Sequence, residues 1–180
     1  EKYDNLQGGF IWDWVDQSLE YKDKNGKPYL AYGHDYHPDL PTDGNFLNNG
    51  LVDPYRNPHP HLSEVKKVYE PVQFNYLGNG NIEIENKNFF ADLSDKTLEW
   101  KLLKNGKDSI KATGITTNTL PQEKSIWKIE KFPLHLDTEN EYILEVRLVQ
   151  KTATKLIPEG HEIGWDQFIL NKRKTNKPKK

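Results

Sequence analysis

The sequence predicts a mainly β protein, in which an immunoglobulin-like β-sandwich is preceded by the last strand, loop and helix of a (β/α)8 barrel. Three observations lead to this prediction. A compact apolar run near the N-terminus is followed by a long turn-rich stretch, a short helical pattern comes next, and an alternation of apolar and polar residues begins at Val72. We place the barrel segment at residues 1–70, the sandwich at 71–171 and a basic tail at 172–180.

The first segment has the pattern of strand, loop and helix. Residues 8–15 open with Gly8-Gly9 and continue as a mostly apolar and aromatic run, which is typical of a strand buried on both faces. The following stretch combines many turn residues with aromatic ones, which favours an ordered, functional loop. After Pro58 and Pro60, apolar residues recur every three or four positions until Pro71, so we predict a short amphipathic helix there.

The second segment has the pattern of short antiparallel strands joined by tight turns. Apolar and polar positions alternate on both sides of Gly78-Asn79-Gly80-Asn81, which predicts a hairpin. A second hairpin is predicted around Asn105-Gly106, and further strands at residues 126–129, 142–149 and 164–170. About seven short strands over roughly a hundred residues indicate an immunoglobulin-like sandwich.

Charge and composition narrow the classes of partner. The protein has 25 Lys and Arg against 27 Asp and Glu, but six of the cations and none of the acids lie in residues 172–180. The body is therefore acidic and offers no general basic face for nucleic acid. The tail has no aromatic residue on which a base would stack, so we interpret it as a linker or chain end, with a nucleic-acid arm as the alternative. No apolar run approaches the length of a membrane span.

Cysteine is absent. This excludes disulfides and thiolate zinc sites, and it leaves the redox compartment unmarked, so both the cytoplasm and the periplasm of a bacterium stay open. The chain begins with Glu1-Lys2-Tyr3 instead of methionine, which we interpret as an interior cut in a longer protein.

Five motifs in roughly the first seventy residues carry a family resemblance. In chain order they are Gln7 to Leu19 (QGGFIWDWVDQSL), Ala31-Tyr32-Gly33-His34-Asp35, Asp43-Gly44-Asn45-Phe46, Asn49-Gly50-Leu51-Val52 and Arg56-Asn57-Pro58-His59-Pro60. In type and order they resemble the eighth barrel strand and the following loop of the large β-galactosidases of glycoside hydrolase family 2. Beyond Pro71 the resemblance rests on a β-sandwich in the place where the family has one, and on Gly160-His161 ahead of Trp165.

The resemblance implies a retaining hydrolase of terminal β-D-galactosides. Such enzymes use a carboxylate nucleophile and a carboxylic acid/base about 5 Å apart. In the family both glutamates lie on barrel strands upstream of the point where this chain begins, and Glu1 does not match the strand of the nucleophile. We therefore assign no catalytic residue within the chain, and we expect the chain alone to hydrolyse no galactoside.

The resemblance also implies three site residues. Trp12 matches the tryptophan on which the galactose ring packs, a role that suits an indole because the C–H face of a pyranose lies flat against it. A non-proline cis peptide bond after this tryptophan is implied as well. Phe46 and Asn49 match the sodium site at the edge of the substrate, through a backbone carbonyl and a side-chain oxygen. Mg2+ is implied for the parent protein, with ligands outside this chain.

Other interpretations of single residues remain open. Asp13 and Asp16 flank Trp14 in the manner of an acid and base pair, but we favour capping or pairing with arginines of neighbouring loops, and we assign Trp14 to packing. A transition-metal site, and with it a metal-dependent hydrolase, would need convergence of a set whose spacing matches no established helix motif: His34, Asp35, His37, His59 and His61.

Two functions from different classes fit these patterns. The first is a β-galactosidase fragment that supplies sugar-stacking and ion-site residues, with a galactoside, the rest of the parent barrel and a homo-oligomer as partners. The second is a non-catalytic carbohydrate-binding or interaction module built on the sandwich, which would display solvent-facing aromatic residues clustered on one face or loop. Trp100, Trp127 and Trp165 are candidates, although their alternating strands favour burial. We expect the aromatic residues of the first segment to be disordered, to pack against the sandwich or to be covered by a second copy.

Overall fold

A computed structural model of the chain describes residues 3, 5, 8–116, 118–133 and 135–171. The chain divides into two compact units, Glu1–Val68 and Tyr69–Lys180. The tail at 172–180, interpreted above as a linker or a nucleic-acid arm, lies outside the described residues. Within the described ranges, no helix is long and apolar enough to cross a membrane.

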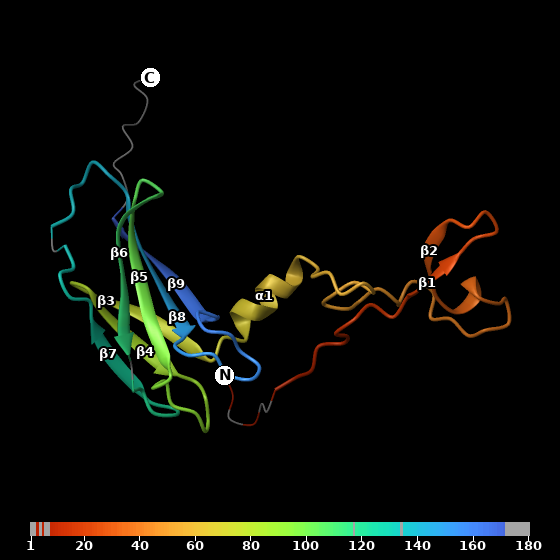
Figure 1. The fold of residues 1–180 in the computed structure, drawn as a ribbon, viewed down its shortest axis with the longest axis horizontal. Coiled ribbons are helices and arrows are strands. Elements are labelled where there is room, and N and C mark those ends of the chain that lie inside the picture. The colour runs from red at the N-terminus through yellow and green to blue at the C-terminus, as the bar shows by residue number, and fades with distance from the viewer. Residues whose placement is uncertain (1–2, 4, 6–7, 117, 134, 172–180) are drawn as a thin grey trace, which may run out of the picture. The chain divides into compact units, whose positions relative to one another are not determined.

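The first unit contains a small hairpin and two helices (Figure 1). Strands β1 (Leu19–Lys22) and β2 (Pro28–Ala31) pair antiparallel, and their turn is closed by Asp23, whose Oδ1 accepts hydrogen bonds from the backbone N–H groups of residues 25 and 27. The 3-10 helix η1 (Gly33–Asp35) follows, and α1 (His61–Val68) ends the unit. The predicted helix after Pro60 is confirmed. The hairpin was not predicted, because its strands are only four residues long.

The predicted buried strand at residues 8–15 is not formed. In this run Val15 alone takes part in a β-bridge, which is parallel and involves Val52. No strand of the described residues pairs with the run, so its backbone bonds to the loop at 47–52 and its aromatic side chains lack a covering layer. Trp14 is 60% exposed, and its assignment to packing is therefore wrong for this chain.

The second unit is a sandwich of two antiparallel sheets (Figure 1). One sheet has the order β3-β4-β7, formed by β3 (Val72–Gly78), β4 (Asn81–Asn86) and β7 (Lys124–Lys128). The other has the order β6-β5-β8-β9, formed by β6 (Lys107–Thr116), β5 (Lys96–Lys104), β8 (Tyr142–Gln150) and β9 (Glu162–Asn171). The predicted strands and hairpins of this unit are confirmed.

Two hairpin turns show why the sequence folds in this way. Asn79 and Gly80 join β3 to β4 with φ of 52° and 77°, and Asn105 and Gly106 join β5 to β6 with φ of 50° and 74°. Successive positive φ values match the twist of the flanking strands, and asparagine followed by glycine adopts them at the lowest cost.

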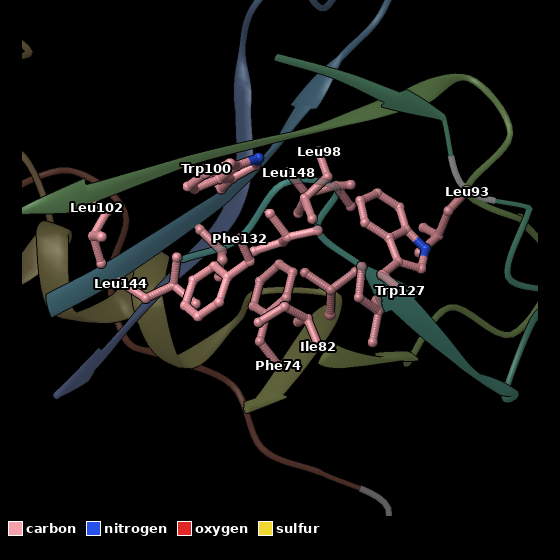
Figure 2. Packing of buried hydrophobic residues seen from close by; sticks show 14 of the residues in the cluster. Phe74, Ile82, Leu93, Leu98, Trp100, Leu102, Trp127, Phe132, Leu144 and Leu148 are labelled. Carbon is pink, nitrogen blue, oxygen red and sulfur yellow. The ribbon is translucent and has the colours of Figure 1, made fainter. Parts of the chain in front are cut away.

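The core of the sandwich lies between the two sheets. Alternate residues of β5 and β8 point inward, while Glu145 and Arg147 of β8 are only partly covered. Figure 2 shows the inward-facing side chains of β5 and β8, such as Leu98 and Leu148, against Phe74 and Ile82 of the first sheet. Phe132 lies beside Trp100. The ring centroids of Trp100 and Phe132 are 6.2 Å apart. Each fully buried leucine or isoleucine contributes about 1.5–3 kcal/mol to folding relative to its exposed state.

Candidate functional site

Backbone hydrogen bonds join the two stretches that contain the predicted site residues. The N–H of Asp13 donates to the carbonyl of Asn49 at 3.2 Å, and the N–H of Leu51 donates to the carbonyls of Asp13 at 3.1 Å and Trp14 at 2.9 Å. Further hydrogen bonds link Asp16 with Val52, Gln17 with Leu47 and Ser18 with Asn48. We refer to residues 12–18 and 47–52 as the paired segments.

Trp12 lies at the start of the paired segments. Its side chain is 68% exposed, and its peptide bond to Asp13 is cis, as the resemblance implies. Because Asp13 bonds to the backbone of Asn49, Trp12 and Asn49 are held close together along the paired segments. An exposed indole of this kind offers a flat apolar face with one N–H donor at its edge.

The side-chain amide of Asn49 is buried and has no partner among the described residues. Within the described residues, neither its amide oxygen nor its amide nitrogen makes a hydrogen bond. A buried polar group left in this state costs about 1–3 kcal/mol, so the amide is suited to a ligand. Phe46 precedes it in a turn, where its N–H donates to the carbonyl of Asp43 at 3.4 Å and its ring is 58% exposed. An amide oxygen and a backbone carbonyl are neutral oxygen ligands of the kind that hard cations take.

Asp16 is the buried acid of the paired segments. Its Oδ1 accepts a hydrogen bond from the N–H of Gly50 at 2.8 Å, and its Oδ2 accepts one from His59 Nε2 at 2.8 Å. Asp13 instead accepts a hydrogen bond from the side chain of Gln17. Of the two expected roles, bonding to backbone N–H groups is seen at Asp16 and pairing with an arginine is not, because a peptide N–H and an imidazole already satisfy its carboxylate. The two acids have separate partners and do not form an acid and base pair.

A turn directly after the paired segments brings His59 to Asp16. The Asp53 carboxylate accepts hydrogen bonds from the side-chain amide and the backbone N–H of Asn57, both at 2.8 Å. The side-chain bond is the main cause that holds the pKa of Asp53 below its ordinary value. Beyond this turn Pro58 forms a bridge with Val52, which places the next residue, His59, over Asp16.

The candidate metal ligands do not converge. Within the described part of the chain, no group of three His, Asp or Glu side chains is arranged to hold a metal ion. His59 and His61 stack with their ring centroids 5.5 Å apart, and His61 Nε2 donates to the carbonyl of Gly50 at 3.0 Å. His37 Nδ1 accepts the N–H of Asp39 at 3.2 Å. These contacts occupy three of the histidines without forming a ligand set.

The sandwich displays an aromatic pair that no sequence pattern predicts. Trp100 and Trp127 are buried and Trp165 is half-buried. In the loop between β4 and β5, however, Phe89 is 73% exposed and Phe90 is 98% exposed, with ring centroids 6.3 Å apart. The only signal in the sequence is the adjacency of two phenylalanines outside an alternating run.

Comparison with known proteins places both units in one class, the glycoside hydrolases. Residues 1–74 match the model of the TIM barrel domain of glycosyl hydrolases family 2, and residues 82–171 match the model of β-galactosidase domain 4. The chain belongs to glycoside hydrolase family 2, as a segment that joins the end of the TIM barrel domain to the β-sandwich that follows it.

Solved structures of one enzyme also resemble the chain. The exo-chitosanase CsxA of Amycolatopsis orientalis has 19% sequence identity over 71% of this chain, with a TM-score of 0.45. Another structure, described as the inhibition of the exo-β-D-glucosaminidase CsxA by a glucosamine-configured castanospermine and an amino-australine analogue, has 19% identity over 69% of this chain, with a TM-score of 0.44. The chain spans 14% of the length of each of these structures.

Proposed function

We propose that the chain is part of a retaining β-galactosidase and that it supplies sugar-stacking and ion-site residues to catalytic glutamates elsewhere in the parent protein. The match of residues 82–171 to β-galactosidase domain 4 supports this substrate class. The observation that carries the proposal is the hydrogen bonding between the paired segments, because it holds Trp12 close to the partnerless amide of Asn49. Hydrolysis with retention needs two carboxyl groups about 5 Å apart, and the family resemblance implies that both lie upstream of Glu1.

Trp12 is the sugar-stacking residue in this proposal. The exposed indole would lie against the C–H face of the galactose ring and leave the hydroxyl groups free for hydrogen bonds. The backbone hydrogen bond between Asp13 and Asn49 joins the two stretches that carry this apolar ring and the polar amide, and a sugar requires both kinds of group.

Asn49 and Phe46 are the ion-site residues. A sodium ion would be held by the side-chain oxygen of Asn49 and the backbone carbonyl of Phe46, with an upstream carboxylate as a further ligand. The bound ion would supply a fixed positive charge to the polar side of the sugar site. The partnerless state of the Asn49 amide supports this assignment, since an ion would satisfy its oxygen and a sugar hydroxyl its nitrogen. Mg2+ belongs to the parent, on ligands outside this chain.

The proposal is tested on the parent enzyme with p-nitrophenyl β-D-galactoside. Trp12→Leu should lower kcat/KM at least about tenfold, because it removes a ring contact worth more than about 1.4 kcal/mol in the transition state. Trp14→Leu is the matched control, since it removes a tryptophan of the same run that the proposal does not place against sugar. It should change kcat/KM less than about threefold.

Two outcomes would overturn parts of the proposal. Equal losses in Trp12→Leu and Trp14→Leu would remove the stacking role of Trp12. Faster cleavage of p-nitrophenyl β-D-glucosaminide than of the galactoside would overturn the substrate class. The 180-residue chain alone should hydrolyse neither compound, and turnover that is abolished by changing one of its own acids would contradict the location of the catalytic glutamates.

A carbohydrate-binding sandwich is the second candidate, and the exposed pair Phe89 and Phe90 favours it. The loop that carries them is held in place: Gln122 Nε2 donates to the carbonyls of Lys87 at 2.8 Å and Asn88 at 3.1 Å. Two adjacent phenyl rings on a fixed loop offer apolar faces to a saccharide chain. The affinity of such a site would be independent of Trp12.

Affinity electrophoresis of the 180-residue chain in gels with soluble β-galactan tests this candidate. The polysaccharide should retard the wild-type chain and Trp12→Leu, and the Phe89→Ser/Phe90→Ser double variant should migrate as in a plain gel. Leu156→Ser is the matched control, because it removes an exposed apolar side chain from a different loop of the sandwich. Equal mobility of the wild-type chain in both gels would rule the candidate out.

A further inference from the structure

Both peptide units that flank Gly50 are held at each end. In the unit before it, the carbonyl of Asn49 accepts the N–H of Asp13 at 3.2 Å and the N–H of Gly50 donates to Asp16 Oδ1 at 2.8 Å. In the unit after it, the carbonyl of Gly50 accepts a hydrogen bond from His61 Nε2 at 3.0 Å, and the N–H of Leu51 donates to the carbonyls of Asp13 and Trp14. Side chains hold two of these four peptide groups.

Space as well as hydrogen bonding fixes this glycine. A Cβ atom at position 50 would lie 2.3 Å from the backbone nitrogen of Asp16 and 2.4 Å from the carbonyl carbon of Val15. No side chain fits there, so the backbone at Gly50 packs directly on the backbone of Val15 and Asp16. The orientation of the preceding residue, Asn49, is thereby tied to the backbone of residues 15 and 16.

His59 contacts both side chains that bond to Gly50, namely Asp16 and His61. Asp16 Oδ2 accepts a hydrogen bond from His59 Nε2, and the ring of His59 stacks on that of His61 at an interplanar angle of 16°. Asp16 is buried, so its bond to the Gly50 N–H is a charge-assisted bond in a low-dielectric setting. Asp16, His59 and His61 form one connected unit beneath the Gly50 backbone, and we refer to these three residues as the Gly50 clamp.

We propose that Asp16 and His61 are positioning residues that fix the backbone at Gly50 and thereby orient the side-chain amide of Asn49 toward the ligand. This inference rests on the proposed function for the role of Asn49 as a ligand-facing residue. Neither residue touches the ligand. The Asn49 amide makes no hydrogen bond to the described residues, so no side-chain partner fixes its direction. Its direction therefore depends on its own backbone, which the Gly50 clamp holds in place.

Nuclear magnetic resonance of the 180-residue chain tests the positioning directly. Asp16→Ala should speed hydrogen exchange of the Gly50 amide about tenfold or more, because it removes a bond to a charged acceptor. It should also move the Asn49 side-chain amide resonances toward those of a freely rotating amide. Asp23→Asn is the matched control: it changes another loop carboxylate of the same unit, which accepts the backbone N–H groups of residues 25 and 27 and has no contact with Gly50.

His61 provides a second test that tolerates substitution, because it lies exposed at the start of α1. His61→Leu removes the donor to the Gly50 carbonyl and should shift the Asn49 amide resonances in the same direction as Asp16→Ala. His61→Gln keeps an N–H donor and should restore the wild-type positions. Unchanged Asn49 resonances in both Asp16→Ala and His61→Leu would overturn the proposal, as would a His61→Gln spectrum that matches His61→Leu.

Kinetics of the parent enzyme separate this inference from the proposed function. His61→Leu should raise KM for p-nitrophenyl β-D-galactoside, and the NaCl concentration that gives half of the sodium effect, each about fivefold, with kcat within twofold and with rescue by His61→Gln. A fall in kcat at unchanged KM would overturn the positioning role. If the wild-type enzyme shows no sodium effect, the ion assignment of the proposed function fails, and the resonances of Asn49 still decide the clamp.

Discussion

The phenol of Tyr142 donates a hydrogen bond to Asp137 Oδ2 at 2.8 Å, at the point where β8 begins. The other oxygen of this carboxylate accepts the backbone N–H groups of Glu139 at 3.1 Å and Asn140 at 3.0 Å. In immunoglobulin-like sandwiches a tyrosine at this corner usually bonds to upstream backbone. Here the acceptor is a carboxylate, so the corner of the sandwich responds to pH.

Removing the hydroxyl group of Tyr142 should destabilise the sandwich. Tyr142→Phe deletes one hydrogen bond from a buried ring and should lower the free energy of unfolding by about 1 kcal/mol. Urea unfolding of the 180-residue chain, followed by circular dichroism, measures the change. Tyr55→Phe is the control, because its hydroxyl bonds to Glu20 in the first unit and should leave the unfolding of the sandwich unchanged. Coincident transitions for Tyr142→Phe and wild type would refute the prediction.

The same corner should make stability depend on acid pH. Hydrogen bonds from the Asn140 side chain and then the Tyr142 phenol lower the pKa of Asp137 from 3.8 to about 2. Since the folded pKa lies below the unfolded one, the stabilisation is present above about pH 4 and is lost as the pH falls toward about 2.

Comparison of two variants isolates this effect. Asp137→Asn should be less stable than wild type at neutral pH and should lose less stability than wild type between about pH 4 and about pH 2. Urea midpoints at several pH values in this range measure the difference. Glu139→Gln removes a charge from the same loop and should keep the wild-type slope. Parallel slopes for Asp137→Asn and wild type would count against Asp137 as the group responsible.

The fold of the second unit was open to prediction because its signals are local. Leu144, Val146 and Leu148 alternate with polar residues along β8, and each asparagine-glycine pair marks a turn by its own backbone preference. These patterns act over a few residues. They need no knowledge of the partner strand to identify the elements.

The site was less predictable because its contacts are distant in sequence. Asp16 and His59 are 43 positions apart, and only the turn after Val52 brings them together. The strand prediction for residues 8–15 failed for a related reason: an apolar run forms a buried strand only where other strands cover it. The exposure of Phe89 was not predictable either, since no local pattern distinguishes an exposed loop phenylalanine from a buried one.

Asn86 should be the main support of the loop that displays Phe89 and Phe90. Its Nδ2 donates to the carbonyls of Ala91 at 2.9 Å and Thr119 at 3.1 Å, and its Oδ1 accepts both N–H donors of Asn88 at 3.0 Å. Asn86→Ala removes these four hydrogen bonds next to the core, although the Thr119 carbonyl keeps the N–H of Leu93, and should lower the free energy of unfolding by about 2–4 kcal/mol.

Asn88→Ala is the matched control for this prediction, because it removes only one of the four bonds while the backbone bond to Asn86 remains. It should cost no more than about 1 kcal/mol. Urea unfolding measures both variants under the same conditions. Equal losses would show that Asn86 acts as one polar contact among several and is not the centre of the loop.

The close approach at Gly50 should make the first unit intolerant of a single methyl group. Gly50→Ala places a Cβ atom 2.3 Å from the Asp16 nitrogen, so the paired segments must separate and the hydrogen bonds of Asn49 and Leu51 must break. Gly9→Ala is the matched control, because a Cβ atom there meets nothing within 4 Å and the residue lies in the same unit. Amide hydrogen exchange should show lost protection at Leu51 and Val52 in Gly50→Ala alone, while the strands of the sandwich keep theirs. Retained protection of Leu51 in Gly50→Ala would mean that the two segments are not held in the register described, and the placement of Trp12 beside Asn49 would fall with it.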